Sequence, residues 1–406
     1  MKFLSVLLLT LAASLALAGD IAVKGETIYT SAGEPIKNGV VIIEGGKITA
    51  VGENLEIPDG MKTLEAKVVT PGLIDARTVV GLAGYLNQDH NQDQLEKSAA
   101  IQPELRAIDA YNTREPLVQW LREHGITTIN TGHGPGEIIS GQTMIVKTVG
   151  DTVSEAVVRA EAMVASTLGD SALVDSHDKR KSPGTKGKIA AMLRNQLVEA
   201  QNYKEKIATA DGDDDKPPPP RNLRLETMVR VLDGELPFLV TANRHNDIMT
   251  TLRIAEEFDI KIILDGAAES YLLIDEIKES GVSVIIHPQM VRFTGDKENV
   301  TYNTARKLIE ADIPVAFQSG YEGYVPKTRV VLFEAAMTLP YGMSFEHALN
   351  AITINAAKIL GVDDRIGSIE VGKDGDLALY DGDPFEWTSH AVGTVIEGEV
   401  VSDIKR

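Results

Sequence analysis

The run Phe238-Leu239-Val240-Thr241 is followed by a helical pattern from Asp247 to Phe258 and by a second apolar run, Lys261-Ile262-Ile263-Leu264. Apolar runs of this length that alternate with helical patterns indicate parallel strands whose two faces are covered by helices. This stretch therefore predicts an α/β fold.

The same alternation extends in both directions along the chain. Further helices are expected over 113–124, 269–280, 303–311 and 329–337, and further strands over 126–131, 283–286 and 314–317. Enough strand–helix units fit for an eightfold barrel, although the pattern alone also allows an open doubly wound sheet. Residues 169–220 interrupt the alternation with helical pieces over 186–210 and an exposed, acidic and proline-rich loop at about 211–220, to which we assign no chemistry.

Both ends of the chain carry short β-type runs separated by glycine turns. Residues 40–44, Gly45-Gly46 and residues 47–51 have the pattern of a hairpin, and residues 376–380 and 392–401 are again strand-like. A small sheet needs a partner layer, which the opposite end of the chain can supply. We therefore expect residues 19–70 plus 366–406 to form a composite β-sandwich domain, beside a barrel domain over residues 71–365.

The first 18 residues have the pattern of a secretory signal peptide. Lys2 precedes an apolar run from Leu4 to Ala18, which ends in Ala16-Leu17-Ala18 before Gly19. This run is too short for a membrane span. The chain has no cysteine, which excludes a lipoprotein anchor, disulfides and thiolate zinc sites. We expect an exported, soluble protein, either periplasmic or secreted.

Composition narrows the classes of partner. An apolar fraction of 43% is enough to build a sizeable core. The formal net charge of −19 repels phosphate backbones and anionic membrane surfaces, so nucleic acid and membrane partners are disfavoured. We attribute this acidity to solubility.

Val69-Thr70-Pro71-Gly72-Leu73-Ile74-Asp75 resembles the opening of the first barrel strand in the amidohydrolase superfamily. Residues 351–361, 365–373 and 374–380 resemble the closing signature of that superfamily, and within it the chain is most similar to the imidazolonepropionase branch. The resemblance implies a (β/α)8 TIM-type barrel with a β-sandwich built from both termini. It also implies metal-dependent hydrolysis of C–N bonds in cyclic amides or in N-acyl and dipeptide-like substrates.

The resemblance further implies metal ligands at positions that this chain has changed. A His-x-His pair would follow Asp75, because side chains two residues apart on a strand point the same way, but Arg77 and Val79 stand there. A guanidinium has no lone pair for a metal and valine has no donor atom. The ligand positions of strands five, six and eight fall on Thr241, Gly266 and Gly320, and that of strand four on Ala165, with Lys147 a less favoured substitute. A slip of one residue at strand eight offers Ser319 or Tyr321. We therefore expect no metal cofactor.

Losing the metal removes the nucleophile of the family reaction. Metal-bound water titrates near pH 7 instead of ~15.7. General acid–base catalysis alone supplies ~10²–10⁴-fold, well below the ~10⁶-fold and upward that is usual for enzymes. Hydrolysis of the family type is therefore expected to be weak or absent.

Several polar residues remain as candidates for ligand binding at the barrel mouth. Arg77 could hold a carboxylate, or form a salt bridge to an acid such as Asp265. His133, within Gly132-His133-Gly134-Pro135-Gly136, could contact a ligand or belong to a tight turn. His245, Asp265 and His287 could form a relocated zinc site, or be rim residues satisfied by hydrogen bonds.

Other residues after the expected strands carry weaker signals. Residues 87–94 could cover the mouth as a lid or be a solvated loop, and Arg292, Tyr321 and Tyr324 could line it.

Three functions follow from these alternatives. The first is a metal-free barrel that binds a small-molecule ligand or a protein partner. The second is an active C–N bond hydrolase that uses relocated zinc ligands. The third is a structural subunit paired with an active paralogue; homo- and hetero-oligomers are both left open.

Overall fold

The structure is a computed structural model that describes residues 19–86, 88–174, 182–211, 217–286, 295–320 and 330–406. The expected signal peptide over residues 1–18 lies outside these ranges, as do His287, Arg292, Tyr321 and Tyr324. Within the described ranges, no helix has the length and apolar character needed to cross a membrane.

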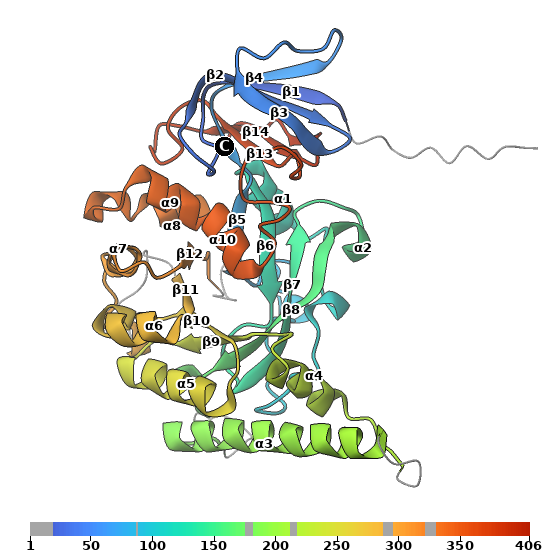
Figure 1. Cartoon of the computed structure of the whole chain (residues 1–406), viewed down its shortest axis with the longest axis vertical. Helices are drawn as coiled ribbons and strands as arrows, with labels where there is room; N and C mark the ends of the chain where they lie inside the picture. The colour runs from blue at the N-terminus through green and yellow to red at the C-terminus, as the bar shows by residue number, and fades with distance from the viewer. Residues whose placement is uncertain (1–18, 87, 175–181, 212–216, 287–294, 321–329) are drawn as a thin grey trace, which may run out of the picture.

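One sheet of eight strands forms the barrel (Figure 1). Its strands, in spatial and chain order, are β5 (Leu73–Thr78), β6 (Ile126–Gly132), β7 (Ile139–Lys147), β8 (Val157–Thr167), β9 (Phe238–Ala242), β10 (Ile262–Gly266), β11 (Ser283–Ile286) and β12 (Val315–Phe317). A parallel bridge between Thr78 and Gly320 joins the two edges and closes the sheet. The predicted barrel is confirmed.

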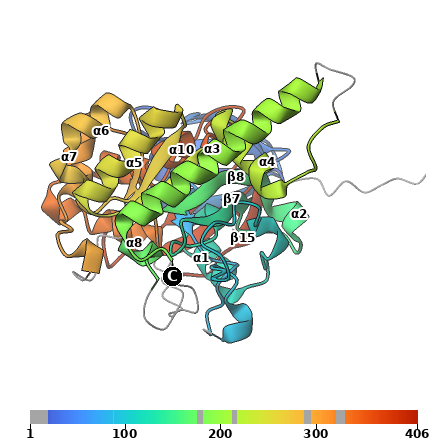
Figure 2. The same cartoon turned by 90° about the horizontal axis from the view of Figure 1, so that it is seen from below.

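Helices cover the outside of the barrel. The helices α5 (His245–Phe258), α6 (Ile274–Ser280) and α7 (Thr304–Glu310) follow β9, β10 and β11 and lie side by side along them (Figure 1). The long helix α3 (Lys186–Asp211) crosses the face seen from below, beside α4 (Figure 2). The remaining helices are α1 (Pro116–Glu123), α2 (Val153–Ala156), α4 (Leu223–Leu232), α8 (Val331–Ala336), α9 (Phe345–Ala351) and α10 (Ile354–Leu360). Short 3₁₀ turns lie at 89–91, 107–109, 170–172, 270–272, 295–297 and 339–341.

The expected parallel order fails at one strand. β7 pairs antiparallel with both β6 and β8, whereas β8 to β12 are mutually parallel. Only residues 133–138 connect β6 to β7, and a parallel crossover needs a dozen or more residues. The glycine-rich segment around His133 is therefore a hairpin turn.

The two ends of the chain share a second sheet, as expected. Its order is β15 (Glu399–Ser402), β14 (Ala391–Ile396), β13 (Leu377–Tyr380), β4 (Lys62–Pro71), β1 (Ile21–Ile28), β2 (Ile36–Glu44) and β3 (Lys47–Glu53). The antiparallel pair of β13 with β4 joins the C-terminal strands to the N-terminal ones. All seven strands belong to one hydrogen-bonded sheet, which we call the terminal sheet; the domain limits given above stay a prediction.

Gly72 links the two sheets at the point where β4 ends and β5 begins. A Cβ at this position would overlap the side chain of Thr127. Only glycine therefore allows β5 to enter the barrel this close to β6.

The barrel strands alternate between an outer and an inner face. The inner face carries a buried cluster that includes Ile74, Ala76, Ile145, Leu239, Ile263, Ile285 and Ala316. Residues two positions further along a strand share the same face. Thr241, Asp265 and Gln318 therefore lie on the inner face, one layer closer to the carboxyl ends of the strands.

Lys147 ties the barrel to the terminal sheet. Its Nζ atom lies 2.9 Å from Asp374 and 2.5 Å from Asp376, and its side chain is only 4% exposed. Burial alone would lower the pKa of Lys147, but the two carboxylates outweigh it and raise the pKa. Lys147 thus belongs to this junction, and the alternative strand-four position, Ala165, carries only a methyl group in β8.

We expect Lys147→Met to lower the free energy of unfolding by roughly 3–5 kcal/mol, because it leaves the buried carboxylate of Asp376 without its cation. Urea unfolding measures the loss. Lys24→Met is the control: its exposed pair with Glu65 should contribute only about 0–1 kcal/mol. Equal losses in the two variants would contradict the assigned role.

Candidate functional site

A hydrogen-bonded triad occupies the inner face of the barrel. The Thr241 hydroxyl donates to Oδ2 of Asp265, and Nε2 of Gln318 donates to Oδ1 of the same carboxylate. All three side chains are buried, and Asp265 and Gln318 have no exposed surface. Both oxygens of Asp265 are therefore engaged, one by a residue of β9 and the other by the residue that follows β12.

A second carboxylate, Asp75, connects the edges of the barrel sheet. Its Oδ1 atom accepts hydrogen bonds from the backbone N–H groups of Ser319 at 3.1 Å and Arg77 at 3.2 Å, and its Oδ2 atom accepts one from the Ser319 hydroxyl. Burial raises the pKa of Asp75 to about 7, although these bonds and the charge of Arg77 act in the opposite direction. Asp75 can therefore change its protonation state near neutral pH.

Arg77 and His133 lie together at the ends of β5 and β6. The Arg77 guanidinium donates to the backbone oxygen atoms of His133 and Thr78, and only 1% of the residue is exposed. The acid that we considered as its alternative partner, Asp265, is held by Thr241 and Gln318 instead. Arg77 thus places a fixed positive charge beside the β6–β7 turn.

The His133 imidazole is buried and has no hydrogen-bond partner for either ring nitrogen among the described residues. Burial and the nearby charge of Arg77 lower its pKa to about 4, so the ring is neutral at pH 7. The loop after β5 reaches this turn, because the Gly134 N–H donates to the Gln94 carbonyl oxygen at 2.7 Å.

The relocated zinc site does not gather among the described residues. His245 begins α5, and its Nδ1 atom lies 2.8 Å from Glu269 while its side chain is 58% exposed. Asp265 lies in the triad, and His287 is outside the described ranges. Within those ranges, no group of three or more His, Asp or Glu side chains could hold a metal ion.

The five expected ligand positions do not fit a metal of the family type. Val79 is buried and has no donor atom, and Arg77 is bonded to carbonyl oxygens. Thr241 donates its proton to Asp265. Gly266 and Gly320 have positive φ angles of 78° and 88°, a conformation that favours glycine.

The register places Asp265, one residue before Gly266, level with Thr241.

The sequence did not single out Asp75 as a site residue, and it did not identify Gln318 or Asn130. Asp75 lies inside the motif that carried the resemblance. The sequence shows where it stands in the chain, but it does not show its burial or its hydrogen bonds. Gln318 and Asn130 follow the period-2 alternation of inner-face residues, which would have revealed them once the register was known.

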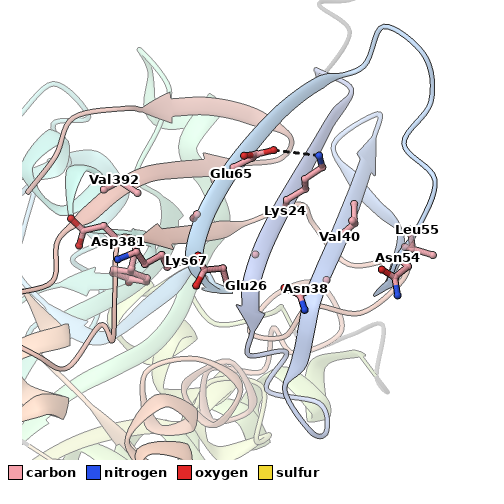
Figure 3. Close-up of a pocket in the computed structure, with 14 residues that line it drawn as sticks. Lys24, Glu26, Asn38, Val40, Asn54, Leu55, Glu65, Lys67, Asp381 and Val392 are labelled. Atoms are coloured by element: carbon pink, nitrogen blue, oxygen red, sulfur yellow. Dashed lines mark hydrogen bonds and ion pairs between the residues drawn. The ribbon is translucent and has the colours of Figure 1, made fainter.

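A hollow outside the barrel lies on the terminal sheet (Figure 3). It has a volume of about 690 Å³ and includes Lys24, Glu65, Val40, Leu55 and Asp381 in its lining. Lys24 and Glu65 pair across it at 3.3 Å. None of the sequence-predicted site residues lines it, so the barrel mouth stays the candidate site.

Comparison with known proteins agrees with this architecture. Residues 77–402 match the Amidohydrolase family, which is most of the chain. The chain belongs to the amidohydrolase family. A crystal structure of an amidohydrolase from Thermotoga maritima MSB8 is 28% identical, with a TM-score of 0.90 over 95% of this chain and 100% of that one.

Curated relatives point to the same family. An imidazolonepropionase of Porphyromonas gingivalis is 27% identical over 401 residues and 89% of each chain. Amidohydrolase tasK of Hapsidospora irregularis is 23% identical over 396 residues, which are 90% of this chain but only 40% of that protein. The predicted resemblance to the imidazolonepropionase branch is confirmed.

Asp75→Asn should change how stability depends on pH. The folded protein keeps the Asp75 proton up to about pH 7, whereas the unfolded chain releases it near pH 4. The protonated Asp75 therefore contributes on the order of 4 kcal/mol to the free energy of unfolding. This contribution is complete below pH 4 and is lost as the pH rises through 7. Urea unfolding from pH 4.5 to 8 should show that the free energy of unfolding of the variant rises relative to that of the wild type as the pH increases.

The exposed Asp312 supplies the matched control, since its side chain is 88% exposed. Asp312→Asn should differ from the wild type by a nearly constant amount over the same range. A constant difference for Asp75→Asn as well would rule out the raised pKa.

Proposed function

We propose that this protein is an exported member of the amidohydrolase family whose barrel mouth binds a small polar molecule without a catalytic metal. The observation that carries the proposal is the triad of Thr241, Asp265 and Gln318. It fills the inner face at the strand ends with side chains that bond to one another.

The energetics of the triad support this function. A metal at Asp265 would have to replace hydrogen bonds from Thr241 and Gln318. The Thr241 hydroxyl would then be left buried without an acceptor, and Nε2 of Gln318 would keep only the carbonyl oxygen of Ile285. An unsatisfied buried group costs about 1–3 kcal/mol. The other expected positions offer no compensating ligands, because Val79, Gly266 and Gly320 have no donor side chains.

Loss of the metal removes the usual nucleophile, yet polar groups remain. The charge of Arg77, the neutral ring of His133 and the titratable carboxyl of Asp75 all lie at the ends of neighbouring strands. In barrel folds this face carries the ligand site. These groups favour binding over hydrolysis, since general acid–base catalysis alone accelerates a reaction by at most ~10⁴-fold.

The alternative hydrolase with relocated zinc ligands has less support. His245 bonds to Glu269 at an exposed helix start, and Asp265 is fully buried in the triad. Pairing with an active paralogue has no specific observation in its favour.

Metal analysis of the mature protein tests the proposal. We expect protein purified without chelators to contain substoichiometric zinc, and its turnover of imidazolonepropionate and N-acyl amino acids to stay at background. Adding zinc or a chelator should change neither result, because the changed positions offer no ligands. One equivalent of zinc together with chelator-sensitive turnover would refute it.

A further inference from the structure

We infer that the inner face of the β6–β7 hairpin seats an uncharged ligand group that donates hydrogen bonds. The inference rests on the proposed binding function of the barrel mouth and names the chemistry of its ligand. Three buried side chains of the hairpin carry it: Asn130, Thr143 and His133.

The orientation of the Asn130 amide is fixed by its neighbours. Its Nδ2 atom lies 3.0 Å from the carbonyl oxygen of Ala76, which can only accept a hydrogen bond. The amide nitrogen must therefore face Ala76, and Oδ1 faces away. That oxygen is buried and has no hydrogen-bond partner among the described residues.

Thr143 and His133 continue the same face. In the regular register of β6 with β7, Asn130 lies opposite Ile145 and Gly132 lies opposite Thr143. Ile145 belongs to the inner cluster, so Thr143 shares the inner face. The His133 ring lies over Gly141, two residues before Thr143 in β7, where a Cβ would overlap the ring. The Thr143 hydroxyl, like the ring nitrogens, has no partner within the described part of the chain.

Gln318 presents a matching oxygen on the other side of β5. Its Nε2 atom donates to Asp265 and, at 3.3 Å, to the carbonyl oxygen of Ile285, so both contacts require the nitrogen. Oε1 is left buried and unpartnered in the described structure. Gln318 directly follows β12, which the bridge between Thr78 and Gly320 joins to β5, so Gln318 lies across β5 from Asn130 of β6. The two amide side chains thus come from the two strands on either side of β5.

This arrangement selects the chemistry of a ligand. The amide oxygens of Asn130 and Gln318 can only accept hydrogen bonds, while a hydroxyl and a neutral imidazole can do both. A carboxylate could not pair with the amide oxygens, because both can only accept hydrogen bonds. A cation would lie near the guanidinium of Arg77. An uncharged group with two N–H or O–H donors matches the two amide oxygens, and the hydroxyl and the imidazole can adapt to its remaining donors or acceptors.

Hydantoin is a suitable probe, because it is an uncharged, rigid ring with two N–H donors. The matched control is 1,3-dimethylhydantoin, which has no N–H donor. Crystals of the mature protein soaked in each compound should show hydantoin donating to Asn130 Oδ1 or Gln318 Oε1, and the dimethyl compound absent. Ordered water only in both soaks, or equal binding of both compounds, would overturn the inference.

Two conservative variants of β7 extend the test to solution. Thr143→Val and Ser140→Ala each remove a buried hydroxyl that has no partner among the described residues. Ser140 lies three residues before Thr143, at an irregularity of the β7–β8 ladder, and Gln142 between them bonds to Thr227 of α4. Both variants should fold and stay at least as stable as the wild type, since neither loses a hydrogen bond made within the described structure.

Calorimetric titration with hydantoin should show about fivefold weaker binding for Thr143→Val and no change for Ser140→Ala. Unchanged binding in both variants, or equal weakening in both, counts against the hairpin site. These results concern the ligand class alone. Stoichiometric zinc in the purified protein would instead refute the proposed function, so the two failures are distinguishable.

Discussion

The hydrogen bonds between Asp75 and Ser319 are the contact on which the site depends. They join the first and last strands of the barrel sheet, beside the bridge between Thr78 and Gly320. Only a closed sheet brings the ends of β5, β6, β9, β10 and β12 around one interior. Asp75 therefore has a structural role in closing the barrel that does not depend on a metal.

The sequence predicted the frame of the molecule well, because its strands are buried on both faces and its helices have one apolar face. The strand expected at 283–286 coincides with β11, and the helix expected at 247–258 lies within α5. The antiparallel direction of β7 was missed, although the short glycine-rich connection at His133 was a hairpin signal. The sequence also identified the positions where the resemblance implies metal ligands, but no linear pattern could reveal that Thr241 and Gln318 both donate to Asp265. Such contacts depend on the register between strands.

Frame and site can change independently in this fold. The outer faces of the barrel strands pack with the helices in one large apolar cluster, and Lys147 joins the barrel to the terminal sheet. The side chains of Thr241, Asp265 and Gln318 belong neither to this cluster nor to the Lys147 junction. Substitutions there leave the packing of the frame in place, as expected for sites carried on a shared scaffold.

A buried polar layer is costly unless its groups are satisfied, and the two halves of this one differ. On the side of β9, β10 and β12, the Asp265 carboxylate is completed by its neighbours, and little is left for a ligand to contact except Oε1 of Gln318. On the β6–β7 side, Asn130, Thr143 and His133 retain unmet hydrogen-bonding capacity within the described structure. In the first half the polar side chains satisfy one another, and in the second the unmet hydrogen-bonding capacity lies on one hairpin. A recognition surface displaced from the metal positions toward β6 and β7 is what this asymmetry favours.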